Sequence, residues 1–192
     1  QVKNIHSTPL GLLRSIPIPP KPWHTVSMDF VVELPLTQSG YTTVFTVIDH
    51  LTKMGHLIPL KKRPSAPELT DIFVSNIVKL HGLPSVFITD RGSQFISQFW
   101  RNLCKSLDME VRLSSSYHPQ TDGQAERMNQ TMEQYLRCLL INLEEDWSNL
   151  LWAVEFAYNN STQSSIGVSP FYCQQGYHPK SSPFDIAVSS NL

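Results

Sequence analysis

Residues 23–34 read WHTVSMDFVVEL and residues 41–49 read YTTVFTVID, two runs that are rich in β-branched and aromatic side chains. The turn signal QSG at residues 38–40 lies between them, and residues 54–60 form a third run of the same kind. Strands that follow one another this closely, with short turns between them, predict an antiparallel meander. We therefore expect the ordered domain to begin with three paired β-strands.

The apolar pattern changes to a helical period after the third strand. A helix that begins at Ser65 or Pro67 and ends at Gly82 is predicted by four apolar residues at helical spacing: Leu69, Phe73, Ile77 and Leu80. Further patterns predict short strands at 85–89 and 110–113 and helices at 95–107, 123–143 and 146–158. This order of elements is typical of an α/β domain with a mixed five-stranded sheet and helices on both faces.

The composition limits the class of protein. The chain has 192 residues, 15 basic and 16 acidic, with a formal net charge of −1. This balance argues against a polybasic nucleic-acid binder, but it is compatible with a nuclease-type enzyme whose acidic site offsets basic contacts. Charged residues make up 16%, which is too few for a disordered chain, and charge and proline interrupt every stretch that could span a membrane. We expect no membrane association.

Proline and serine mark the two ends of the expected domain. Residues 16–22 read IPIPPKP, a composition that favours extended polyproline geometry. We expect a proline-rich linker at 1–22, a core domain at 23–175 and a C-terminal linker or tail at 176–192. The chain begins at Gln1 without a methionine, so we expect it to be a fragment of a longer protein.

Three cysteines are far apart in the sequence and form no CxxC pair: Cys104, Cys138 and Cys173. An odd number of separated cysteines favours reduced, buried thiols in an intracellular protein over disulfides or a zinc site.

Three acidic residues lie at distinctive positions in the predicted elements: one inside a strand, one at the end of a strand and one at the start of a helix. Asp29 interrupts the first strand, Asp90 ends a short buried strand, and Glu126 lies in the first turn of the long helix, on its polar side. Three converging carboxylates repel one another unless a divalent cation neutralises them, and oxygen ligands select Mg²⁺ or Mn²⁺ over zinc. Two such ions could bind the attacking oxygen and the leaving oxygen when a phosphodiester bond is displaced. A single aspartate at a strand end can also be only a turn former.

The segments around these carboxylates carry a more specific signal. They read WHTVSMDFV, FITDRGSQF and YHPQTDGQAERMN, and 35 residues separate Asp90 from Glu126. Together with VIDH in the second strand and FAYNNS late in the chain, they resemble the catalytic core of retroviral and Ty3/gypsy retrotransposon integrases. The resemblance extends over about residues 20–175 and matches the D,D(35)E spacing of that family.

The resemblance implies an RNase H-like fold and a metal-dependent polynucleotidyl transferase that performs 3′-end processing and DNA strand transfer. It makes Asp29, Asp90 and Glu126 the catalytic metal ligands, with two Mg²⁺ per active site when DNA is bound, Mn²⁺ as a substitute and Asp29 bridging both ions. It also implies element-end and target DNA as partners, a homodimer or higher oligomer, and action in the nucleus. Two alternatives are a domesticated, non-catalytic chromatin- or protein-binding module and a related RNase H-like nuclease or transposase.

Further residues are candidates for DNA contacts. Residues 117–123 resemble the flexible catalytic loop of the family, residues 61–63 are the densest basic run, and residues 127–130 follow Glu126. Some relatives carry lysine where this chain has Gln130, and a basic run after a strand is often only a solvated turn. Asp49 is expected near the site but not as a metal ligand. The candidate DNA contacts are Tyr117, His118, Gln120, Arg127, Asn129, Gln130, Lys61, Lys62 and Arg63.

Overall fold

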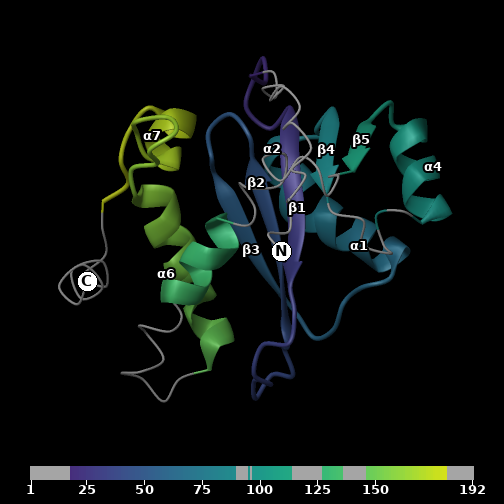
Figure 1. Cartoon of the computed structure of the whole chain (residues 1–192), viewed down its shortest axis with the longest axis horizontal. Helices are drawn as coiled ribbons and strands as arrows, with labels where there is room; N and C mark the ends of the chain where they lie inside the picture. The colour runs from purple at the N-terminus through teal and green to yellow at the C-terminus, as the bar shows by residue number, and fades with distance from the viewer. Residues whose placement is uncertain (1–17, 90–94, 96, 114–126, 136–145, 181–192) are drawn as a thin grey trace, which may run out of the picture.

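A computed structural model of the chain describes residues 18–89, 95, 97–113, 127–135 and 146–180 (Figure 1). Most of the two predicted linkers therefore lies outside the described residues. The same holds for these residues of the sequence analysis: Asp90, Tyr117, His118, Gln120, Glu126 and Cys138. Within the described part, no helix is both long enough and apolar enough to cross a membrane.

The strands form one mixed sheet in the order β3-β2-β1-β4-β5. Their bounds are β1 Thr25–Val31, β2 Thr43–Asp49, β3 Gly55–Leu60, β4 Val86–Thr89 and β5 Glu110–Leu113. Strands β1, β2 and β3 pair antiparallel, whereas β4 pairs in parallel with both β1 and β5. The predicted meander and the mixed five-stranded sheet are confirmed.

Helices connect and cover these strands. Their bounds are α1 Ala66–Phe73, the π-helical turn η1 Val74–Val78, α2 Lys79–His81, α4 Gln98–Ser106, α6 Trp147–Asn160 and α7 Pro170–Gln175, and residues 127–135 are also helical. The predicted start at Ser65 is confirmed by a capping box, in which the Ser65 backbone N–H donates to Glu68 Oε2 at 2.7 Å. The helical segment ends at Gly82, whose φ of +80° is rarely adopted by other residues.

Two apolar clusters lie on opposite faces of the sheet. One contains Val26, Met28 and Phe30 of β1 together with buried residues of α1, η1 and α4. The other contains Val44 and Ile48 of β2 together with buried residues of α6 and of the 127–135 helix. In Figure 1, α6 lies beside β3 at the left and α4 beside β5 at the right. The expectation of helices on both faces is confirmed.

The stripe of the first helix departs from prediction at its last member. Leu69, Phe73 and Ile77 are buried, but Leu80 is 57% exposed. The intervening π-turn η1 takes up one more residue than an α-helical turn, so the apolar stripe after it is rotated away from the position of Leu80.

The last part of the chain holds a helix that we did not predict and a cysteine whose predicted burial was wrong. Residues 170–175 form α7, because Ser169 caps the helix by accepting a hydrogen bond from the backbone N–H of Tyr172 at 3.1 Å and Pro170 suits its first turn. Cys173 on α7 is exposed, not buried. Cys104 is buried as expected, and this burial raises the pKa of its thiol to about 11.

We expect Leu69→Ala to lower the free energy of unfolding by about 2–5 kcal/mol, because it leaves a cavity in a fully buried position. The matched change Leu80→Ala should alter it by no more than about 0.5 kcal/mol, because that side chain lies mostly in solvent. Urea denaturation of both variants measures the difference. Equal losses would contradict the rotation of the stripe by η1.

Candidate active site

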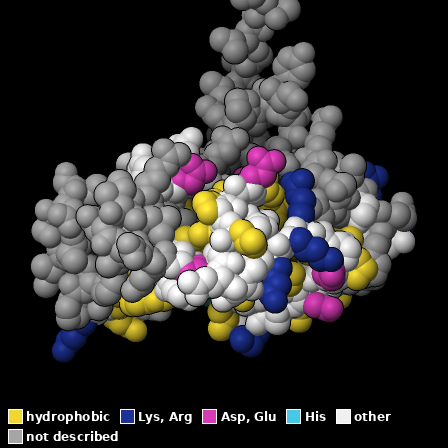
Figure 2. All heavy atoms as spheres, turned by 90° about the horizontal axis from the view of Figure 1, so that it is seen from below, with side chains coloured by type: hydrophobic (Ala, Val, Ile, Leu, Met, Phe, Trp, Pro, Cys, Tyr) yellow, Lys and Arg dark blue, Asp and Glu magenta, His cyan; other side chains and the backbone are white. Residues whose placement is uncertain are grey.

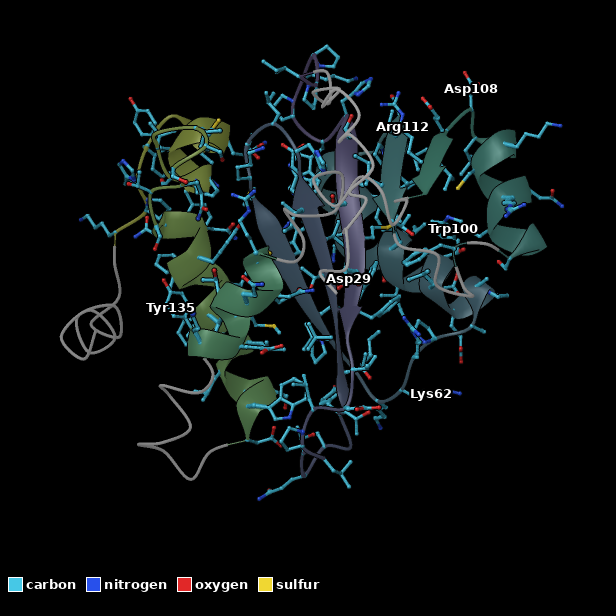
Figure 3. All side chains as sticks on the ribbon, in the orientation of Figure 1. Asp29, Lys62, Trp100, Asp108, Arg112 and Tyr135 are labelled. Carbon is cyan, nitrogen blue, oxygen red and sulfur yellow. The ribbon has the colours of Figure 1, made fainter. Side chains whose placement is uncertain are left out.

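Asp29 faces the side of the sheet that is covered by the 127–135 helix. Side chains alternate along a strand, so Met28 and Phe30 point into one apolar cluster and Asp29 points the opposite way. Its carboxylate is half-buried, and Oδ1 accepts a hydrogen bond from the Phe30 backbone N–H at 2.8 Å. Figure 3 shows Asp29 on β1, in the centre of the sheet.

Asn129 joins this carboxylate to a second strand. Its Nδ2 donates to Asp29 Oδ2 at 2.7 Å, and its Oδ1 accepts from the Thr46 hydroxyl at 2.7 Å. Thr46 lies directly opposite Asp29 in the antiparallel register of β1 and β2. The three side chains therefore form a hydrogen-bonded chain that ties β1, β2 and the 127–135 helix together.

The described residues next to the other two predicted ligands also approach this region. Thr89, which precedes Asp90, pairs with Met28, which precedes Asp29. Arg127, which follows Glu126, is helical and lies two residues before Asn129. The parallel pairing of β1 with β4 and the hydrogen bond of Asn129 thus place Thr89 and Asn129, the described ends of the other two motif segments, next to the part of β1 that holds Asp29.

A second polar pair lies on the same face of the sheet, at Ser27, two residues before Asp29 on β1. The Ser27 hydroxyl shares a hydrogen bond with His50 Nε2, and both residues are buried. Burial, followed by the charge of nearby Lys53, lowers the pKa of His50 to about 4. His50 is therefore a neutral, structural partner of Ser27 near neutral pH.

Asp49 is engaged in the turn that follows β2. Its Oδ1 accepts from the Trp23 backbone N–H at 3.0 Å, and its Oδ2 accepts from the backbone and hydroxyl of Thr52 at 3.0 and 2.8 Å. In the register Asp49 lies opposite Val26, three residues before Asp29 on β1. These bonds give Asp49 a role in holding the turn, and it is not a metal ligand in our assignment.

The described candidates for DNA contacts differ in their surroundings. Arg127 and Gln130 are exposed on the helix, whereas Asn129 is only 8% exposed and contacts Asp29 instead of solvent. This places Asn129 inside the site, a role that we did not predict. A polar Thr46 between apolar neighbours on β2 was the only sequence signal for such a network.

The basic run after β3 has one anchored member. The Arg63 guanidinium lies 5.4 Å from the ring centroid of Phe30, the residue that follows Asp29. Lys62 is exposed, with its Nζ 3.8 Å from Glu68 Oε1, and Figure 3 shows it at the periphery of the molecule. Lys61 is exposed as well. Figure 2, a view from below relative to Figure 1, shows several lysine and arginine side chains gathered to the right of its centre.

The chemistry of the donor set fits a hard divalent cation. Asp29 offers carboxylate oxygens, as do the other two predicted ligands by residue type, and such ligands suit Mg²⁺ or Mn²⁺. Among the described residues, no group of three or more His, Cys, Asp or Glu side chains could hold a metal ion. The other two predicted ligands, Asp90 and Glu126, lie outside those residues.

Comparisons with known proteins give a consistent result. The profile of the family described as integrase core domain matches residues 19–119. The Tf2-3 and Tf2-4 transposon polyproteins of Schizosaccharomyces pombe are each 35% identical over 189 residues, which is 98% of this chain. The chain spans only 14% of the length of these relatives.

Solved structures show the same fold. The magnesium complex of the HTLV-2 integrase catalytic core domain, in its trimeric form, has a TM-score of 0.64 at 18% identity and covers 82% of this chain and 99% of its own. A chain from the structure of a simian T-cell lymphotropic virus intasome in complex with PP2A regulatory subunit B56 gamma has a TM-score of 0.71 at 19% identity. The match covers 94% of this chain and 65% of that one. The expected RNase H-like fold is confirmed.

Thr46→Val keeps the shape of the side chain but removes the hydroxyl that donates to Asn129 Oδ1. We expect a loss of about 1–3 kcal/mol in the free energy of unfolding, because a buried acceptor is left without this donor. The control is Thr131→Val on the 127–135 helix, because the Thr131 hydroxyl donates to Arg127 O near solvent and its loss should cost less. Chemical denaturation compares the two, and a Thr46→Val variant as stable as the wild type would contradict the network.

The stability of the chain should fall as the pH drops from about 6.5 to about 4, because the unfolded state protonates His50 while the folded state excludes that proton. Once the pH is below about 4, this difference in proton binding has lowered the free energy of unfolding by about 3 kcal/mol in total. In His50→Gln this contribution is absent, so its free energy of unfolding should decline less over that window. Denaturant titrations at several pH values test this, and parallel pH curves for the two proteins would argue against a buried neutral His50.

Proposed function

Because the chain belongs to the integrase core domain family, we propose that it is the catalytic core of a retrotransposon integrase that performs 3′-end processing and DNA strand transfer. The observation that carries the proposal is the hydrogen bond between Asn129 and Asp29. It brings the helix that follows Glu126 onto the strand that holds Asp29, as a shared carboxylate site requires. The relatives extend far beyond this chain, so the activity of the whole protein is part of the proposal.

Asp29, Asp90 and Glu126 would hold two Mg²⁺ ions when DNA is bound, with Mn²⁺ as a substitute. When bound, such ions lower the pKa of the attacking water or 3′-hydroxyl and offset charge that develops on phosphorus. The residues of the chain supply the arrangement. Asn129 fixes one oxygen of Asp29 by donating to it, and Thr46 fixes the orientation of the Asn129 amide by donating to its oxygen.

Helix geometry supports the assignment of Glu126. Residues three positions apart lie on the same side of a helix, one turn from each other. Asn129 directs its side chain at Asp29, so a helix that extends back by one turn would direct Glu126 toward the same carboxylate. The parallel register of β1 and β4 pairs Met28 with Thr89. If the same register continued by one residue, Asp90 would lie beside Asp29.

Basic and polar residues of the motif segments and of the basic run would contact DNA phosphates. We propose Arg127 and Gln130 on the helix, Lys61, Lys62 and Arg63 after β3, and Tyr117, His118 and Gln120 in the loop before Glu126. Within the basic run, the guanidinium of Arg63 lies against the ring of Phe30, on the side of the sheet opposite to Asp29. Phosphate contacts of this kind make DNA binding dependent on salt.

The proposed reaction also suggests where and with what the protein acts. Its substrates would be the DNA ends of the element and a target duplex, and joining them would take place in the nucleus. A homodimer or higher oligomer would hold the two element ends. An integrase-derived module that binds chromatin or a protein without catalysis, or a related nuclease or transposase, is the alternative for the same fold.

The decisive experiment incubates the protein with element-end oligonucleotides and Mg²⁺ or Mn²⁺ and follows 3′-processing and strand transfer on a gel. We expect products from the wild type, and a loss of at least about 100-fold in Asp29→Asn, Asp90→Asn and Glu126→Gln, because each change removes one charged metal ligand. Asp49→Asn is the matched control, an acidic residue of the same sheet outside the triad. If the wild type forms no product while partner binding is unaffected by the triad changes, the binding module is favoured.

A further inference from the structure

The 127–135 helix approaches β3 at a glycine. Gly55 is the first residue of β3 and pairs with Ile48 of β2. An ideal Cβ added at Gly55 would lie 2.3 Å from Met128 Sδ and 2.5 Å from Met128 Cε, far closer than nonbonded atoms can be. The end of the Met128 side chain therefore occupies the volume in which any other residue at position 55 would place its Cβ.

This close approach, and not the backbone conformation, is the reason for a glycine at this position. Gly55 is not among the described residues with positive φ, so alanine could adopt its extended strand conformation. A glycine inside a strand often marks a point where another part of the protein comes near. Here that part is the helix turn that carries Met128 and Asn129.

Asn159 of α6 holds the backbone of Gly55 in place. Its Oδ1 accepts from the Gly55 N–H at 2.9 Å, and its Nδ2 donates to the Gly55 carbonyl at 2.9 Å. Asn159 is 1% exposed, so both bonds are formed in the interior, where losing either one leaves a polar group unsatisfied. One side chain thus satisfies both backbone groups of Gly55 and links β3 to α6.

Met128 transmits this arrangement to the site. It is fully buried in the cluster formed with α6, so a thioether displaced by a new methyl group would have to move against packed neighbours. Tyr158 Cε1 lies on the same side, 3.5 Å from the ideal Cβ position. Asn129, the next residue after Met128, forms the bond to Asp29. If the Met128 side chain inserted less far toward β3, the helix would shift, and Asn129 would move relative to the Asp29 carboxylate.

We propose that Gly55, held by Asn159, is a positioning residue that sets how closely the 127–135 helix approaches the sheet and so where Asn129 meets Asp29. The consequence for metal binding rests on the proposed function, since it takes Asp29 as a ligand of the divalent cation. The placement of Asn129 does not depend on that function.

The test uses the side-chain amide NMR signal of Asn129 as a reporter of its bond to Asp29, together with Mn²⁺ affinity measured by electron paramagnetic resonance. In Gly55→Ala we expect the Asn129 signal to shift and Mn²⁺ to bind about 5- to 10-fold more weakly. Met128→Val removes the two atoms that the new methyl group would meet. The double variant should therefore return both readouts most of the way toward the wild type.

Two further variants separate positioning from a general loss of stability. Asn159→Asp keeps an acceptor for the Gly55 N–H but loses the donor to its carbonyl, and it should shift the Asn129 signal in the same way. Ile77→Val on the opposite face lowers the thermal midpoint without touching this helix, and it should leave the Asn129 signal and Mn²⁺ affinity unchanged.

An unmoved Asn129 signal in folded Gly55→Ala would overturn the inference, because Met128 would then have repacked without moving the helix. A shifted signal that the double variant fails to restore would overturn it as well. A wild type that binds no Mn²⁺ would count against the proposed function, while the NMR signals would still decide the role of Gly55.

Discussion

The alternation of side chains along β1 is the constraint on which the rest of the structure depends. Val26, Met28 and Phe30 face the apolar cluster beneath α1 and α4, so Asp29 must face the other side. Strand β1 is hydrogen-bonded on both edges, antiparallel to β2 and parallel to β4. A slip of one residue would bury the carboxylate among aromatic rings and move Phe30 to the half-buried position of Asp29, at a high cost in free energy.

Asp29 lies on a strand that is paired on both sides, and the residues that contact it come from β2 and from the 127–135 helix. Thr46 and Asn129 are both buried polar residues, and they are tolerated there because each bonds the next along the chain that ends at Asp29. The helix that supplies Asn129 comes close to the sheet at Gly55, where the absence of a side chain leaves room for Met128. Polar satisfaction and close packing therefore act together in placing the carboxylate.

Much of this arrangement could be predicted from local pattern. Period-two runs identified the strands, and helical spacing together with the Ser65 cap identified the first helix. The prediction was wrong at Leu80, because a π-turn changes the helical period without a sequence signature. It did not include α7, whose apolar patch is short and lies in a Ser- and Gly-rich stretch. The sequence singled out Asn129 as a candidate for DNA contact, and nothing local indicated that it would turn toward Asp29.

By itself the sequence determined the class of the fold, the family resemblance and the three acidic residues with 35 positions between the last two. These properties depend on residue types and short spacings, which a chain carries whether or not it is folded. Only the tertiary structure decided which side chains meet Asp29 and which glycine the helix packs against. Asn129 reaches Asp29 across 100 positions and Thr46 across 83, and contacts at such separations exist only once strand register and helix packing bring distant segments together.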